Sequence, residues 1–129
     1  MLRLSVVIIG LIFVAKGALG FNSDYITVVN GVALLFETFA VNDIINWIHL
    51  LTGFAALLAA ASDKTAKLFC QVFGVIYMIM AIIGFFQGTS ILGLFQTNIQ
   101  TSLANFILGA MMVTLGFGIK LSPKATVTN

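Results

Sequence analysis

The sequence contains very few charged residues for its size. Only 8% of its 129 residues are Asp, Glu, Lys or Arg, whereas 60% are hydrophobic. A water-soluble domain carries about 25% charged residues, so these charges cannot cover a globule of this size in water. We therefore expect a protein that lies largely in lipid, and the length predicts a single domain, residues 1–129.

Other scarcities exclude several classes of function. The net charge of +2 is too small for a nucleic-acid surface. The single cysteine, Cys70, cannot form an internal disulfide, and its apolar surroundings are typical of a buried, inert thiol. His49 is the only histidine, so no structural metal site is predicted. The motifs of phosphate loops, zinc hydrolases and serine hydrolases are absent, and we predict no catalytic residues and no enzyme.

Four long apolar runs predict four membrane-spanning helices. A spanning helix needs ~20 mostly apolar residues, and the runs that qualify cover residues 4–21, 44–61, 66–87 and 102–119. The predicted fold class is therefore all-α, an integral membrane four-helix bundle with the lipid bilayer as its main partner.

The first apolar run has a second interpretation. The stretch MLRLSVVIIGLIFVAKGALG also resembles a secretory signal, with a positive start, an apolar run and small residues at its end. Lys16 interrupts the apolar run close to the supposed cleavage site, which favours a retained helix. Cleavage of residues 1–20 stays open as the alternative.

The basic residues predict the orientation in the membrane. The connections 22–43 and 88–101 contain no Lys or Arg, and they hold three of the four acidic residues. Because basic loops stay in the cytoplasm, we predict that both termini are cytoplasmic and that these two connections are outer loops. Five basic residues fall on the cytoplasmic side, namely Arg3, Lys64, Lys67, Lys120 and Lys124.

The two outer loops are too apolar to be plain linkers. VVNGVALLFETFAV, in the loop 22–43, is too short to span and is typical of an interfacial or re-entrant segment. The loop 88–101 contains the similar stretch ILGLF. We expect both loops to form a partial lid over the helix ends. Asn42 is the expected N-cap of the second helix, and Thr101 or Ser102 that of the fourth.

The two halves of the chain resemble each other. GLIFVAKGALGF (10–21) aligns with GVIYMIMAIIGFF (74–86) at an offset of 64 residues, and FETFAVNDIINWI (36–48) aligns with FQTNIQTSLANFI (95–107) at an offset of 59. The pattern predicts a tandem duplication of a helix–outer loop–helix unit, with both copies pointing the same way. Chance recurrence of Gly, Phe and Ile is the alternative.

Ionisable side chains inside apolar helices are costly, so each is a candidate functional residue. Lys16 lies towards the outer end of the first helix. Its long side chain could reach the membrane surface or form an ion pair with Glu37 or Asp43. A role in binding a substrate or an ion is the alternative.

The second helix carries a polar face. Asn42, Asn46, His49 and Gly53 follow i, i+4, i+7, i+11 spacing, which places them on one side of a helix. We expect this face to meet protein, at a depth similar to that of Asn105 on the fourth helix. Interhelical hydrogen bonds are the favoured explanation; a small-molecule or pigment site, and proton or ion handling, are the alternatives. The predicted cluster comprises Lys16, Asn42, Asn46, His49 and Asn105.

Small residues predict where helices approach closely. Glycine and alanine let helix backbones pack against each other within a bundle or between copies of the chain. The predicted packing residues are Gly10, Gly17, Gly20, Gly53, Ala55, Ala59, Gly109 and Gly116.

The stretch FAVNDIINWIHLLTGFAALLAA resembles the second-helix motif of domain-of-unknown-function family 4383, a group of small bacterial membrane proteins. That motif runs Phe-x-Val-Asn, then Asn-x-x-His-Leu, and its positions here are Phe39, Val41, Asn42, Asn46, His49, Leu50 and Gly53. The resemblance covers nearly the whole chain. It implies a multi-pass protein of the bacterial plasma (inner) membrane and supplies no activity.

The fourth helix departs from that family pattern. Family members often carry a second Asn-x-x-His there, whereas here Asn105 is followed by Phe106, Ile107 and Leu108. Any role that needs paired histidines is therefore disfavoured.

Three functional hypotheses follow. The first is a structural or accessory subunit that packs with a protein partner or with itself. The second is a small transporter or channel that uses the predicted polar cluster. The third is a binder of lipid, quinone or pigment through His49; no particular cofactor is predicted.

Overall fold

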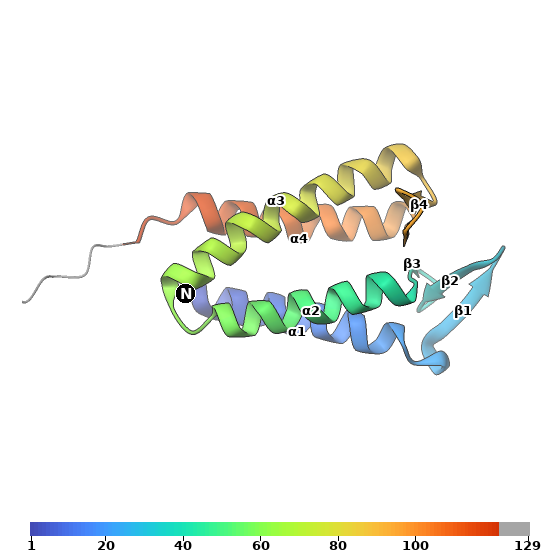
Figure 1. The fold of residues 1–129 in the computed structure, drawn as a ribbon, viewed down its shortest axis with the longest axis horizontal. Coiled ribbons are helices and arrows are strands. Elements are labelled where there is room, and N and C mark those ends of the chain that lie inside the picture. Colours follow the sequence, from blue (N-terminus) through green and yellow to red (C-terminus); the bar gives the residue numbers. More distant parts are fainter. Residues whose placement is uncertain (122–129) are drawn as a thin grey trace, which may run out of the picture.

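The computed structural model describes residues 1–121 and contains four long α-helices. They are α1 (Leu2–Gly20), α2 (Asp43–Ala59), α3 (Asp63–Gln87) and α4 (Ile99–Gly118). All short strands lie together at one end of the helices, which we call the strand end (Figure 1). In chain order, the other elements are a 3-10 turn η1 (Ser23–Tyr25) and strands β1 (Ile26–Val29), β2 (Val32–Leu35), β3 (Phe39–Ala40), β4 (Ser90–Ile91) and β5 (Phe95–Gln96).

The four predicted helices are present, and each begins one to three residues earlier than the apolar runs indicated. Helices α1, α3 and α4 are long and apolar enough to cross a membrane. Helix α2 has 17 residues and is shorter, at the lower limit for a spanning helix.

The prediction of an all-α fold was wrong for the two connections between helices. Strands β1, β2 and β3 form a three-stranded antiparallel sheet, and β4 pairs with β5 in a second antiparallel hairpin. The strand backbones in these connections therefore form hydrogen bonds with one another, and only the short 3-10 turn η1 is helical.

Each hairpin turn contains two successive residues with positive φ. Asn30 and Gly31 have φ of 52° and 81°, and a type I′ hairpin turn requires this pair of conformations. Asn-Gly between apolar, partly β-branched residues is the strongest local hairpin signal, and the interfacial interpretation overlooked it. Leu92-Gly93 forms a similar turn, whereas Phe36-Glu37, with φ of 51° and 56°, carries no such signal in its sequence.

The helices form two close pairs, α1 with α2 and α3 with α4 (Figure 1). Glycine allows this approach. A Cβ atom added at Gly53 would lie 2.7 Å from the Val14 backbone nitrogen, and one added at Gly109 would lie 2.9 Å from that of Met78. Because real Cβ atoms do not come so close to backbone atoms, a larger residue at either position would push the paired helices apart.

The structure places the predicted packing residues in two different settings. The six glycines each lie against the other helix of their own pair: Gly10, Gly17, Gly20, Gly53, Gly109 and Gly116. Ala55 and Ala59 instead line an open groove between α2 and α3. The alanine buried at the α1–α2 contact is Ala56, which faces Gly10.

At the end opposite the strands, basic side chains form hydrogen bonds to the last carbonyls of the paired helices. The Nε of Arg3, at the start of α1, donates to the carbonyl of Ala60 at 2.7 Å. The Nζ of Lys67, near the start of α3, donates to the carbonyl of Ile119 at 2.6 Å. Cations stabilise the partial negative charge at helix C-termini, so each basic residue stabilises the end of its paired helix.

Replacing Gly53 by alanine should destabilise the fold by about 1–3 kcal/mol, the usual cost of overpacking a close contact. Gly118→Ala is the matched control, because a Cβ there meets no atom within 4 Å and alanine favours helix more than glycine. Thermal or denaturant unfolding of the purified variants in detergent measures both effects. Equal stability of the two variants would contradict the close contact at Gly53.

Candidate functional site

Two asparagines connect the helix pairs at the strand end. Asn42 and Asn98 are the N-caps of α2 and α4, and the Oδ1 of each accepts the backbone N–H three residues later. The Nδ2 of Asn42 also donates to the carbonyl of Leu94 at 2.8 Å, and that of Asn98 donates to the carbonyl of Thr38 at 2.7 Å. Each asparagine thus caps its own helix and also bonds to the hairpin that belongs to the other helix pair.

Asn42 lies where the sequence predicted, but the predicted cap of α4 was wrong. Helix α4 starts before Thr101 and Ser102, and Asn98 caps it. Ser102 instead lies inside the bundle, where its hydroxyl is 3.0 Å from that of Thr97. Polar residues in the first turn of α4 had shortened its apparent apolar run.

The two caps also correct the alignment of the halves. Asn42 and Asn98 are 56 residues apart, whereas the sequence comparison used an offset of 59 for this region. At an offset of 56, Asn105 on α4 occupies the position of His49 on α2, and Ser102 occupies that of Asn46. The neighbouring glycines agree with this alignment, because Gly20 contacts Asn46 and Gly84 contacts Ser102.

Three polar residues of the predicted cluster are deeply buried. Asn46, His49 and Asn105 are each 1% exposed. His49 and Asn105 both lie six residues after the first residue of their helix, or ~9 Å from its start at 1.5 Å per residue. Asn42 differs from them, because it is half-buried and its side chain is fully engaged in the cap and in the bond to Leu94.

Aromatic rings surround His49. The Phe13 ring lies 5.6 Å from the imidazole, and the Tyr77 ring stacks on it at 6.3 Å with an interplanar angle of 16°. The Tyr77 hydroxyl donates to the Thr52 hydroxyl at 3.1 Å. Tyr77 therefore has a polar partner from the opposite helix pair, and the imidazole beside it lies against two aromatic rings.

Lys16 turns inwards. Its ammonium lies 5.8 Å above the Phe39 ring of β3. Within residues 1–121 the Nζ atom is buried without a hydrogen-bond partner. The predicted extension to the membrane surface and the predicted ion pairs with Glu37 or Asp43 are therefore not formed.

Helix α4 completes this region from the other side. The Thr101 hydroxyl donates to the carbonyl of Ala40 at 3.4 Å, which places the first turn of α4 beside β3. Asn105 follows one turn deeper on the same buried face. Asn105 therefore lies one helical turn below the contact between α4 and β3.

The buried polar atoms of this region are unpaired. Six of them find no hydrogen-bond partner among the described residues: Lys16 Nζ, Asn46 Oδ1, His49 Nδ1 and Nε2, and Asn105 Nδ2 and Oδ1. The predicted interhelical hydrogen bonds are not formed at these atoms. We call Lys16, Asn46, His49 and Asn105 the unpaired cluster.

The unpaired cluster is costly for the fold. Leaving one buried polar group unsatisfied costs about 1–3 kcal/mol, and native proteins leave few such groups. Chemically, the cluster offers an ammonium, two amides and an imidazole, and no carboxylate. No group of three metal-ligating side chains occurs in the described range. The N–H donors of the cluster suit a ligand that carries an acceptor oxygen.

Comparison with known proteins identifies a family. A family model described as "Domain of unknown function (DUF4383)" matches residues 3–118. The match confirms the resemblance seen in the second-helix motif and supplies no activity. No curated protein and no solved structure matches the chain.

Asn105→Leu should stabilise the fold by about 1–3 kcal/mol, because it removes a buried amide that has no partner at little change in volume. Ser102→Ala, one turn away on the same helix, is the control and should destabilise, because it breaks the bond to Thr97. Unfolding of both variants in detergent measures the difference. A destabilised Asn105→Leu would mean that the amide has a structural partner.

Proposed function

The chain belongs to the DUF4383 family, and we propose that it is a four-pass protein of the bacterial plasma membrane that binds a small solute in its interior. The solute carries an acceptor oxygen, and its binding groups are those of the unpaired cluster. The observation that carries this proposal is the set of six buried polar atoms without partners.

The four-pass arrangement is supported by length, composition and charge. Three helices are long and apolar enough to span, and α2 packs along α1 over its length. We place the strand end outside, because the outer loops lack Lys and Arg and basic loops stay in the cytoplasm. Of the five basic residues, Lys124 lies outside the described range; Arg3, Lys64, Lys67 and Lys120 occur at the end opposite the strands.

A tandem duplication is part of the proposal. An offset of 64 residues relates α1 to α3, since it pairs Arg3 with Lys67 and Gly10 with Gly74. An offset of 56 relates α2 to α4, since it pairs the two capping asparagines. Related positions make related contacts: Arg3 and Lys67 stabilise the ends of their paired helices. The similar bonds of Arg3 and Lys67 to the ends of their paired helices support a duplication over chance recurrence of glycine.

The chemistry of the cluster defines the solute. The Lys16 ammonium and the Asn105 amide can donate, and a neutral His49 can donate from one nitrogen and accept at the other. A carbonyl, hydroxyl or carboxylate oxygen satisfies such donors, whereas the cluster gives a cation no negative partner. The quinone and lipid hypotheses fall within this class, because both molecules carry carbonyl oxygens.

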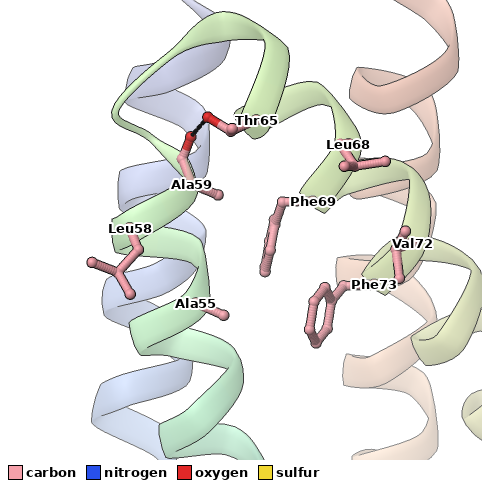
Figure 2. Close-up of a pocket in the computed structure, with 8 residues that line it drawn as sticks. All are labelled: Ala55, Leu58, Ala59, Thr65, Leu68, Phe69, Val72 and Phe73. Carbon is pink, nitrogen blue, oxygen red and sulfur yellow. Dashed lines mark hydrogen bonds between the residues drawn. The ribbon is translucent and has the colours of Figure 1, made fainter.

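A structural or accessory role is the second candidate, and two apolar grooves favour it. One, of about 450 Å³, lies between α2 and α3, where Phe69 and Phe73 face Ala55 and Ala59 (Figure 2). The other, of about 490 Å³, lies between α1 and α4. Such grooves on the flanks of a bundle suit a helix of a partner or of a second copy.

Selective ¹⁵N labelling of histidine tests the binding proposal, because His49 is the only histidine. Titration of the detergent-solubilised protein with acetamide, acetate and a short-chain quinone should shift the His49 resonances with at least one of them. The shift should vanish in Lys16→Met and persist in Lys64→Met, whose lysine is exposed. Unmoved resonances with all three compounds would reject this class of solute.

For the accessory role, gently purified protein should form a defined oligomer or a stoichiometric complex. Ala59→Trp, which fills the α2–α3 groove, should dissociate it, whereas Gly118→Ala should not. Sedimentation in density-matched detergent gives the mass of each species. A strictly monomeric protein without a partner would contradict this role.

A further inference from the structure

We propose that the pocket between the β1–β2 hairpin and the strand ends of α1 and α2 is the entry site of the solute. In this proposal Asn46 forms the floor of the pocket, and Asp43 is a charge filter that favours uncharged solutes over anions. The inference rests on the proposed function, because it supplies the route to the unpaired cluster and narrows the class of solute.

The pocket has the size and lining of a small-molecule site. Its volume is about 380 Å³, and ligand pockets usually range from ~300 to 1,000 Å³. Phe21, Ile26 and Val41 contribute apolar walls, and Ser23 and Asp43 contribute polar groups. An apolar wall with a few polar groups is the usual composition of a site for a small organic molecule.

Asn46 links the pocket to the interior. It lines the pocket, yet it is 1% exposed and its Oδ1 belongs to the unpaired cluster. His49 follows three residues later on the same buried face, ~4.5 Å deeper along the helix. A molecule that displaces the Asn46 amide would have to move only ~4.5 Å further along the helix to reach the level of His49.

The packing of α1 reserves space for this amide. A Cβ atom added at Gly20 would collide with the Asn46 side chain, and one added at Gly17 would lie 2.6 Å from the Asn46 carbonyl oxygen. In the other helix pair the equivalent polar residue, Ser102, is bonded to Thr97. The position of Thr97 is taken here by Val41, which has no polar group to bond Asn46.

The charge at the mouth opposes the charge inside. Asp43 lines the pocket and is exposed, and the outer loops contain no Lys or Arg. A negative mouth lowers the local concentration of anions, and Asp43 is near enough for salt to screen it only partly. Lys16 and the amides further in then favour an acceptor oxygen, so the solute that meets both conditions is uncharged.

Cysteine accessibility tests the entry site. In a Cys70→Ala background, Asn46→Cys and Val41→Cys, which both line the pocket, should react with the uncharged reagent 2-carbamoylethyl methanethiosulfonate. Ala56→Cys, buried outside the pocket, should react at least about tenfold more slowly. Ser23→Cys, at the rim of the pocket, gives the rate expected of an accessible cysteine. If both pocket cysteines are as slow as Ala56→Cys, the pocket is not an entry site.

The charge filter is tested on the same pocket cysteines. The rate of each reagent with a pocket cysteine is divided by its rate with a free thiol in solution. This normalised rate should be about tenfold lower for the anionic reagent 2-sulfonatoethyl methanethiosulfonate than for the uncharged reagent. Asp43→Asn should remove most of this difference, whereas Glu37→Gln, an acidic residue outside the pocket, should leave it in place. Equal rates for the two reagents at pocket cysteines that retain Asp43, or an unchanged ratio after Asp43→Asn, would overturn the filter.

The outcomes separate the two proposals. If the pocket cysteines are unreactive but solutes still move the His49 resonances, the interior site stands and the entry site is wrong. If the cysteines react as expected but His49 never responds, the pocket is a surface site and the interior binding function is wrong.

Discussion

The close approach of helices within each pair is the contact on which the rest of the structure depends. Gly10 and Gly53 let the α1 and α2 backbones meet, and Gly74 and Gly109 do the same for α3 and α4. Once these faces are used within a pair, the remaining buried faces of α2 and α4 must turn towards the other pair. Asn46 packs against Gly17 and Gly20 of α1, so part of the unpaired cluster lies inside the first pair, at a contact that glycine makes possible.

The two pairs are joined by few polar contacts of known geometry. The asparagine caps hold each helix to the opposite hairpin at the strand end, and Tyr77 reaches across to Thr52 near the middle. Between these levels lie His49 and Asn105.

The four helices could be predicted from the sequence, because long apolar runs with charged flanks form few structures other than helices. The sequence also identified Asn42 as a cap, and it indicated Asn46, His49 and Asn105 as polar residues of the interior. It failed for the hairpins, although Asn30-Gly31 is a recognisable hairpin signal. It also failed for the cap Asn98, because the comparison of halves matched Phe36 with Phe95 and missed the Phe-x-x-Asn pattern that both halves share. The lack of partners for His49 could not be predicted, since it depends on what three other helices place nearby.

The second helix pair shows that the fold does not force polar atoms to stay unpaired. Ser102 sits where Asn46 sits in the first pair, and it has Thr97 as a partner. Met80 sits at the position of Lys16, which removes the charge. The second helix pair thus has a hydrogen-bonded serine and an uncharged side chain at these two positions, although Asn105, at the position of His49, is also unpaired. The first pair instead carries the ammonium, the imidazole and an open pocket, an arrangement that costs stability and that a purely structural role would not require.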